Sequence, residues 1–531
     1  MITMATKALN SLSPRSRRTP RATAALIVAA TALGLASCAG GDGSSGSEGG
    51  ASGPEGAKEL AADSRELVAD ENGNGVATTQ AFFDSASEVF VAGEDHNAQA
   101  SAADAAVAAG APMLVVRGEG TARDGNVAAV AEEIERLGAE TVHDYGAGLS
   151  DTDLADGVSI EAIEDFGTQA ADAADPLGEV KRIAGLDSEY DVPAVALISA
   201  QTAEGEGGAA LAATARSAGA EVLGVPVADP RATSESMQAL EDGAVVGLGK
   251  DFDSQDKFDA SAELAAAGEL PGGGGLVFPG RRMVALYGHP SGGALGLMGE
   301  HPPAEAVDRV EKLVDEYQPH TDYPVMPAFE IIATVASSEP GPDGDFSNEA
   351  DPDELIPYID AITEAGGYAF LDLQPGRARL LDQAKLYEEL LKRPNVGLAL
   401  DPEWKIGPDE QPMGRVGHVE AQEVTEVADW LAGLVRDNEL PQKGLIVHQF
   451  QLQMIRDRET INTDHPELAF ILHADGHGGP DQKFDTWNTM QQGLSDDYFM
   501  AWKNFIDEDT PTFTPGQTYD IKPRPWFVSY Q

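Results

Sequence analysis

The chain has 531 residues, of which 42% are hydrophobic, and this is enough material for two domains or slightly more. It carries 89 Asp and Glu against 35 Lys and Arg, which gives a formal net charge of −54 at pH 7. A surface this acidic repels nucleic acid, which is therefore excluded as a partner. The single cysteine excludes an intrachain disulfide and a cysteine metal site.

Residues 1–37 have the organisation of a secretory signal peptide. A basic segment precedes an apolar run over residues 24–35, AALIVAATALGL, which is too short to span a membrane. Leu35, Ala36 and Ser37 stand directly before Cys38 and resemble the lipobox of bacterial lipoproteins. This resemblance implies lipidation of Cys38 and an extracytoplasmic protein that is anchored in the cell membrane. A nucleophilic role for this lone thiol is the alternative.

Residues 38–75 are predicted to form a tether. After Cys38 they begin AGGDGSSGSEGGASGPEG, a Gly/Ser-rich and acidic segment that lacks the apolar side chains needed for a core. We expect this segment to hold the folded part of the chain away from the membrane.

Residues 76–272 are predicted to form an α/β domain. Ala-rich helical runs, such as residues 124–138, separate strand-like runs over residues 88–93, 112–116, 194–200, 221–227 and 244–249. This alternation favours an open parallel sheet with helices on both faces. The glycines lack the spacing of a nucleotide-binding motif, so nucleotide binding is not expected.

Residues 82–116 resemble the type 2 cell-wall-binding repeat of Gram-positive surface proteins. The matching elements are the strand over residues 89–92 (VFVA), the small-residue segment 102–109, and Gly110-Ala111-Pro112 before the next strand. Residues 135–146, ERLGAETVHDYG, follow like the closing strand of a repeat. Members of the family usually carry several tandem units, whereas this chain has one clear unit. The resemblance implies attachment to anionic cell-wall polysaccharide or peptidoglycan.

Residues 273–531 are predicted to form a (β/α)8-type barrel. Amphipathic helices separate most of the predicted strands, which cover residues 283–288, 325–332, 368–371, 396–400, 444–447, 468–472, 498–502 and 526–530. Little helix lies between the last two strands and none follows the final one. The helix-like residues 256–270 before the barrel are therefore a candidate to close it.

Polar residues follow most of these strands, which predicts a ring of functional groups at one rim of the barrel. A capping role explains any single one of them. Carboxylates combined with aromatic residues suit glycoside hydrolysis, which needs one protonated and one ionised carboxyl group. Glu403 is the predicted acid, with Asp372 or Asp401 as base or nucleophile, and Glu330, Asp475 and Asp507 are further candidates. The predicted substrate contacts are His289, Trp404, His448, Gln449, His473, Asp475, Trp502 and Lys503.

Two metal hypotheses stand beside this interpretation. A metal-dependent hydrolase would use His289, Asp401, His448, His473 and Asp475, although no H-E-x-x-H motif occurs. The acidic loop DGDFSNEADPDE places Asp343, Asp345 and Glu354 at calcium-ligand positions of an EF-hand-like loop. Asn348 replaces the glycine expected at its sixth position, and a solvated acidic loop is the alternative.

The predicted protein is thus a lipid-anchored surface protein that binds the cell wall and carries a glycan-active, glycoside-hydrolase-like barrel. A non-catalytic wall- or glycan-binding lipoprotein and a metal-dependent hydrolase are the alternatives. The phrases ALYGHP, LALDPEW and KNFIDEDTP resemble a family of secreted lipoproteins from high-GC Gram-positive bacteria. This second resemblance implies secretion but supplies no activity.

Overall fold

The chain between residues 53 and 531 folds as alternating strands and helices, and the computed structural model describes all of these residues except 151, 173, 206, 412 and 413. The predicted signal peptide, Cys38 and the first part of the predicted tether lie outside the described residues. No helix among the described residues is long and apolar enough to cross a membrane.

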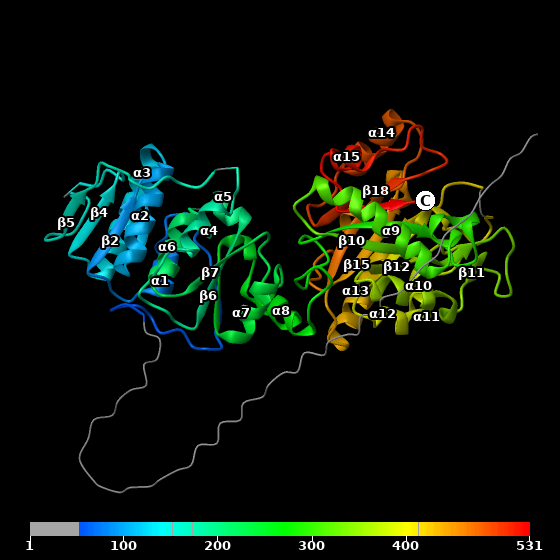
Figure 1. The fold of residues 1–531 in the computed structure, drawn as a ribbon, viewed down its shortest axis with the longest axis horizontal. Helices are drawn as coiled ribbons and strands as arrows, with labels where there is room; N and C mark the ends of the chain where they lie inside the picture. Colours follow the sequence, from blue (N-terminus) through cyan, green and yellow to red (C-terminus); the bar gives the residue numbers. More distant parts are fainter. Residues whose placement is uncertain (1–52, 151, 173, 206, 412–413) are drawn as a thin grey trace, which may run out of the picture. The chain divides into compact units, whose positions relative to one another are not determined.

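The N-terminal α/β region contains two open parallel sheets. Each sheet has four strands, in the orders β3-β2-β4-β5 and β1-β8-β6-β7 (Figure 1). The strands are β1 (Arg65–Val68), β2 (Glu88–Ala92), β3 (Met113–Val115), β4 (Thr141–Tyr145), β5 (Ser159–Ala162), β6 (Ala194–Ser199), β7 (Glu221–Val225) and β8 (Ala244–Leu248). The predicted α/β class is confirmed, but the single sheet expected from the sequence is divided into two.

Alanine-rich helices fill the space next to these sheets. The helices are α1 (Val76–Phe82), α2 (His96–Ala109), α3 (Gly120–Leu137), α4 (Gly178–Ala184), α5 (Ala200–Gly205), α6 (Gly208–Ser217), α7 (Ser234–Asp242) and α8 (Gln255–Leu264). Helices α2 and α6 pack against each other through buried alanines. Such short side chains let two helix backbones approach closely, so one hydrophobic cluster includes residues from both sheets.

Strand β1 corrects the expected extent of the tether. It pairs in parallel with β8, so folded structure begins inside the segment 38–75. Leu67 and Val68 pack against hydrophobic clusters of the α/β region, and this apolar pair explains why the strand forms in an otherwise acidic segment.

The C-terminal region is a closed barrel of parallel strands. In order around the barrel these are β9 (Arg282–Gly288), β10 (Val325–Ala336), β12 (Tyr368–Leu373), β13 (Val396–Leu400), β15 (Lys443–Gln449), β17 (Leu468–Ala474), β18 (Tyr498–Asn504) and β19 (Phe527–Tyr530). Strand β19 pairs directly with β9, with Phe527 opposite Met283, and this pairing closes the barrel. The predicted (β/α)8-type barrel is confirmed.

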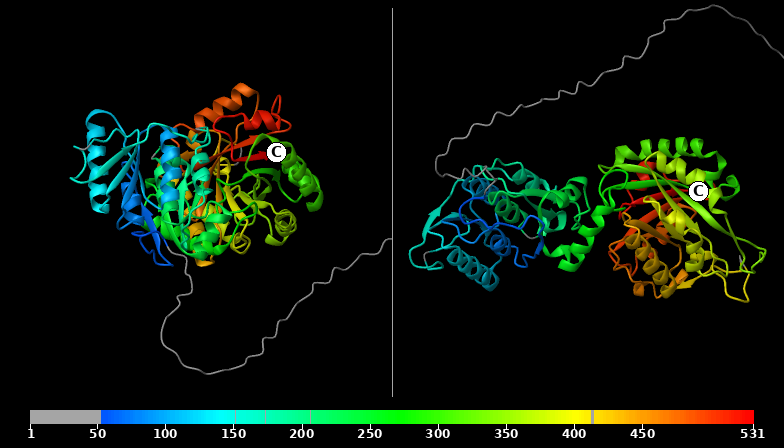
Figure 2. Two further views of the ribbon diagram at one scale, coloured as in Figure 1. Left: turned by 60° about the vertical axis from the view of Figure 1, so that its left-hand side comes forward. Right: turned by 90° about the horizontal axis from the view of Figure 1, so that it is seen from below.

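Helices cover the outside of the barrel (Figures 1 and 2). They are α9 (Pro303–Tyr317), α10 (Pro352–Glu364), α11 (Leu380–Leu386), α12 (Glu388–Leu391), α13 (Ala421–Asp437), α14 (Pro480–Met490) and the short α15 (Pro515–Tyr519) between the last two strands. Helix α8 packs on β1 and buries Phe258 in the α/β region, so it does not close the barrel as expected. Three short strands complete the fold: β11 (Ser347–Glu349), β14 (Val419–Glu420) and β16 (Ile455–Arg456).

The barrel interior is divided into an apolar part and a polar part. Side chains alternate between the interior and the helix layer along each strand. In β17, Ala469 and Ile471 belong to the interior cluster, whereas Leu468, Phe470 and Leu472 pack in the outer cluster. The next interior position toward the carboxyl end of this strand is His473. The other strands change from apolar to polar interior residues in the same way.

Candidate functional site

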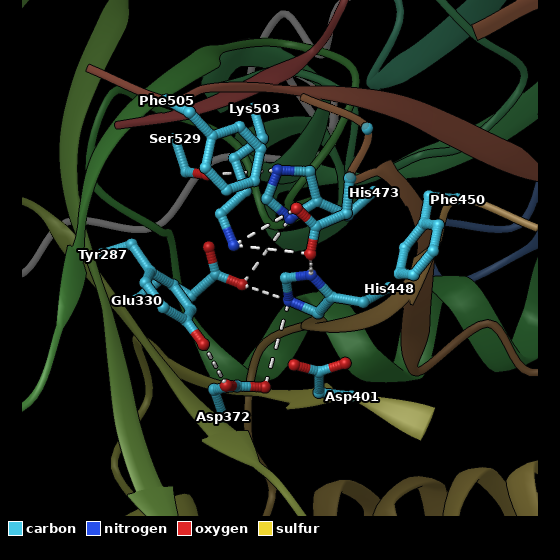
Figure 3. A network of polar contacts seen from close by, with 12 residues as sticks. Tyr287, Glu330, Asp372, Asp401, His448, Phe450, His473, Lys503, Phe505 and Ser529 are labelled. Atoms are coloured by element: carbon cyan, nitrogen blue, oxygen red, sulfur yellow. Dashed lines mark hydrogen bonds and ion pairs between the residues drawn. The ribbon is translucent and has the colours of Figure 1, made fainter. Parts of the chain in front are cut away.

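One interior side chain from each barrel strand, or from the residue directly after it, contributes to a buried polar layer above the apolar interior (Figure 3). The contributors are Tyr287, Glu330, Asp372, Asp401, His448, His473, Lys503 and Ser529, in the order of the strands around the barrel. All of them are at most 3% exposed. The alternation of side chains along a strand explains why these residues point inward, because each lies two residues after an apolar interior residue. Lys503, for example, lies two residues after Ala501.

His448 is the centre of the network. Its Nε2 lies 2.7 Å from Glu330 Oε1, and its Nδ1 lies 2.9 Å from Asp475 Oδ2. The Lys503 ammonium lies 3.3 Å from Asp475 Oδ1, so this carboxylate meets two cationic groups. The Asp372 Oδ1 atom lies 3.9 Å from His448 Nε2.

Hydrogen bonds from aromatic residues hold Asp372 and Asp401 in place. The Tyr287 hydroxyl donates a hydrogen bond to Asp372 Oδ2 at 2.8 Å, and Gln374 Nε2 lies 3.3 Å from that hydroxyl. The Trp404 indole donates to Asp401 Oδ2 at 3.0 Å. The second oxygens of Asp372 and Asp401 have no hydrogen-bond donor among the described residues, although they are buried.

The ion pairs determine which groups carry charge. Burial opposes ionisation of Glu330, but the imidazoles of His448 and His473 outweigh it and lower the pKa of this carboxyl. Burial likewise opposes protonation of His448, yet Glu330 and Asp475 raise its pKa well above 6.5. Burial opposes ionisation of Asp475, whereas Lys503 and His448 bring its pKa down to about 2. Ionised Glu330 and Asp475 therefore flank a cationic imidazole.

Carboxyls that receive no hydrogen bond from a cationic group behave in the opposite way. Burial raises the pKa of Asp372 to about 6 and the pKa of Glu403, with the help of the Asp475 charge, to about 7. Burial, followed by the charge of Glu403, raises the pKa of Asp401 well above its usual value. The site therefore holds ionised and protonated carboxyl groups side by side near neutral pH.

A cavity of about 660 Å³ opens above this network. Its polar lining includes Asp401, Glu403, Asp475 and Lys503, and its aromatic lining is Tyr287, Trp404, Phe450 and Phe505. Glu403 and Trp404 lie in a short turn, Pro402–Trp404, that follows β13 immediately. Lys405, the next residue, binds Glu423 at 2.8 Å and not Glu403. Within the described residues, the Glu403 carboxylate receives no hydrogen bond.

Some predicted site residues lie below the cavity and not in its wall. Glu330, Asp372, His448 and His473 are fully buried and do not line it. The expectation that Asp372 contacts a substrate as base or nucleophile is therefore corrected, because the carboxylates that line the cavity with Glu403 are Asp401, Asp475 and Glu508. Asp507 is exposed and outside the cavity lining.

Gln449 and Trp502 point away from the barrel interior, which corrects their predicted substrate role. Trp502 packs in the outer core with its ring centroid 5.4 Å from that of Trp487, and its indole donates to Asn504. The Gln449 side chain binds Arg458 and the carbonyls of the loop after β15. Trp502 directly precedes the interior residue Lys503, and Gln449 directly follows the interior residue His448. Because side chains alternate along a strand, both side chains point outward.

His289 also lies apart from the network. It binds Ser291 at 2.8 Å and lines a second cavity of about 300 Å³ together with Glu354. Burial lowers the pKa of this imidazole. His289 is therefore not part of the metal-ligand set predicted with His448 and His473.

The acidic loop forms part of a β-hairpin and not an EF-hand. Residues Ser347–Glu349 form β11, which pairs antiparallel with β10. Carboxylate oxygens of Asp343, Asp345 and Glu349 lie within 4.8 Å of one another. Glu354 is outside this group because it belongs to the first turn of α10. The predicted ligand spacing is therefore wrong at its last position.

Sequence reasoning did not identify Tyr287, Gln374, Phe450, Phe505 or Ser529 as site residues. Tyr287 and Ser529 lie two residues after the apolar interior residues Ala285 and Phe527. Counting alternate positions along each strand would therefore have identified them. Phe450 and Phe505 follow β15 and β18 in loops, and no local pattern marks them as cavity residues.

Comparisons with known proteins show only distant similarities. No protein-family model and no curated protein matches the sequence. Among solved structures, Cwp6 from Clostridium difficile is 11% identical, with 55% of this chain and 66% of that chain covered and a TM-score of 0.27. Endonuclease IV from Thermus thermophilus is 13% identical, with coverages of 47% and 92% and a TM-score of 0.25. Similarities at this level carry no conclusion about function.

Proposed function

We propose that the barrel is a glycoside-hydrolase-like enzyme that acts on cell-wall glycan, with Glu403 as general acid and Asp475 as base or nucleophile. The observation that carries this proposal is the contrast between two carboxylates lining one cavity. Asp475 binds His448 and Lys503 and is held ionised, whereas Glu403 has no ion pair among the described residues. Glycoside hydrolysis needs this combination of a proton donor and an ionised carboxylate.

The surroundings of the cavity suit a sugar ring. Its volume of about 660 Å³ is within the usual range for small-molecule sites. Trp404 offers an aromatic face beside Glu403, and Lys503 offers a donor for a hydroxyl oxygen. The burial-raised pKa of Glu403, about 7, keeps a substantial part of this group protonated at neutral pH.

Release of reducing ends from purified wall polysaccharide and peptidoglycan tests this function. We expect turnover by the mature chain, and a loss of at least ~10²-fold in Glu403→Gln and in Asp475→Asn, with glycan binding retained. Lys405→Gln is the matched control, because Lys405 follows the same turn but binds Glu423. Binding without turnover by the wild type would establish a non-catalytic glycan-binding barrel instead.

We also propose that the α/β region attaches the protein to the cell wall and that Cys38 carries the lipid anchor. The resemblance of residues 82–116 to a wall-binding repeat supports the first part, and these residues form a continuous β2-α2-β3 unit. A fragment covering residues 53–272, which includes β1, should sediment with purified walls. Sedimentation of residues 273–531 in its place would assign wall binding to the barrel.

A further inference from the structure

A second chemical feature lies beneath the cavity, where two histidines and one carboxylate converge from three strands. Ligand atoms of Glu330, His448 and His473 lie within 4.8 Å of one another, and the side chains are fully buried (Figure 3). The proposed hydrolysis by Glu403 and Asp475 does not use this group directly.

The outer nitrogen of each imidazole has a fixed partner. His448 Nδ1 lies 2.9 Å from Asp475 Oδ2, and His473 Nε2 lies 3.1 Å from Ser529 Oγ. Histidines that bind metal ions usually engage their second ring nitrogen with a carboxylate or another oxygen in this way. The remaining nitrogens, His448 Nε2 and His473 Nδ1, both face Glu330.

Hydrogen bonding among the described residues leaves part of this group unsatisfied. The hydrogen bond between His448 and Glu330 accounts for one nitrogen and one oxygen. His473 Nδ1 lies 3.6 Å from Glu330 Oε1, too far for a hydrogen bond, and both Nδ1 and Glu330 Oε2 are buried without a partner. Each such atom costs roughly 1–3 kcal/mol in a buried site. If His473 Nε2 carries the proton and donates a hydrogen bond to Ser529, the lone pair on His473 Nδ1 faces the Glu330 carboxylate. A cation between these two groups removes their repulsion.

We propose that Glu330, His448 and His473 bind one divalent first-row transition-metal ion, with Asp475 and Ser529 holding the imidazoles in place. Two imidazole nitrogens and one carboxylate oxygen suit Zn²⁺, Fe²⁺ or Mn²⁺ better than Ca²⁺ or Mg²⁺, which prefer oxygen ligands. Three protein ligands leave at least one coordination position for water. This site goes beyond the proposed hydrolysis, in which Asp475 also takes part. The ion takes the place of the proton between His448 Nε2 and Glu330, while His448 Nδ1 keeps its hydrogen bond to Asp475.

Metal content provides the first test. Bound metal is removed from the mature chain with a chelator, the chain is dialysed against Zn²⁺, and the amount of bound Zn²⁺ is measured by mass spectrometry. We expect a single tightly held ion, whose affinity falls at least ~100-fold in Glu330→Gln and His473→Ala because each removes one ligand. His289→Ala and Asp343→Asn are the controls, since they alter the second cavity and the acidic loop, and both should keep the ion.

Two further measurements cover the case in which a ligand variant fails to fold. Ser529→Ala keeps all three ligands and a nearly unchanged core, and it should weaken Zn²⁺ binding by roughly 10–100-fold. Co²⁺ substituted into the wild type should give visible d–d absorption bands of a low-coordinate site. Bound Co²⁺ without such bands, or a Zn²⁺ affinity unaffected by Ser529→Ala and lost in Asp343→Asn, would overturn the proposal. Neither the Zn²⁺ affinity nor the Co²⁺ spectrum depends on turnover of glycan. A negative result for the metal site is therefore distinguishable from a negative result for the proposed hydrolysis.

Discussion

Trp502 and Lys503 are consecutive residues of β18 whose side chains lie on opposite sides of the barrel wall. The Lys503 ammonium lies inside, 3.3 Å from Asp475 and 3.9 Å from the ring centroid of Tyr287. The Trp502 indole lies outside, between Trp487 and Phe513. One residue of the pair therefore belongs to the functional site and the other to the structural core.

Replacement of Trp502 should reduce stability and not glycan recognition. Trp502 is 1% exposed, and truncation of a buried tryptophan leaves a cavity that costs about 3–5 kcal/mol. We expect Trp502→Ala to lower the free energy of unfolding of the barrel by this amount in urea titrations. Unchanged stability of Trp502→Ala together with a weakened glycan affinity would show that Trp502 contacts the substrate.

Replacement of Trp404 should have the reverse effect. Trp404 is only partly buried and lines the cavity, so Trp404→Ala should weaken glycan binding about tenfold, or ~1.4 kcal/mol, because the aromatic face is lost. Trp404→Phe keeps an aromatic ring and should recover most of the affinity. Trp430→Ala, on helix α13 and outside the cavity, is the control for calorimetric titration. Unchanged affinity in Trp404→Ala would place the glycan elsewhere.

The dependence of kcat/KM on pH should identify the general acid. Glu403 acts in its protonated form, so activity should fall about tenfold per pH unit above its pKa of about 7. The titratable groups around Glu403 are Asp372, Asp401, His448, Asp475 and Lys503. The residual activity of Glu403→Gln should lack this alkaline limb, because the amide does not titrate. An alkaline limb that persists in the variant belongs to another group.

Hydrophobic periodicity was sufficient to predict all strands of the barrel. Each strand is an apolar run that ends in polar residues, and burial on both faces makes such runs distinctive. Strands β1 and β5 were not predicted because they are short and largely exposed, with only a few apolar residues each. The division of the α/β region into two sheets depends on long-range pairing, which no local pattern reveals.

The candidate site was predictable in position but not in detail. Polar residues at strand ends indicated the correct rim, yet selection by residue type alone included Gln449 and Trp502, which point outward. Counting alternate positions from the apolar interior residues would have excluded both and included Tyr287 and Ser529. The partner of Glu403 could not be predicted, because Asp372 lies below the cavity whereas Asp475 lines it, and residue type alone does not reveal this difference in depth.

Localisation is tested through the only cysteine, which lies outside the described residues. The lipobox-like sequence before Cys38 predicts that Cys38→Ala moves the protein from the membrane fraction to the soluble fraction or the medium. Fractionation followed by immunoblotting measures this change, and Ser37→Ala, which retains a small residue, is the control. Full membrane retention of Cys38→Ala would contradict lipid anchoring.

A crystal structure of Glu403→Gln bound to a wall-glycan oligosaccharide tests the proposed active site most directly. The amide keeps the shape of the side chain but cannot donate the proton that cleaves the bond, so an intact oligosaccharide should remain in the cavity. We expect the glycosidic oxygen within about 3 Å of the residue 403 side chain, the Asp475 carboxylate facing the anomeric carbon, and a sugar ring against Trp404. An oligosaccharide bound outside this cavity, or bound within it with its glycosidic bonds away from both carboxyl positions, would contradict the assignment.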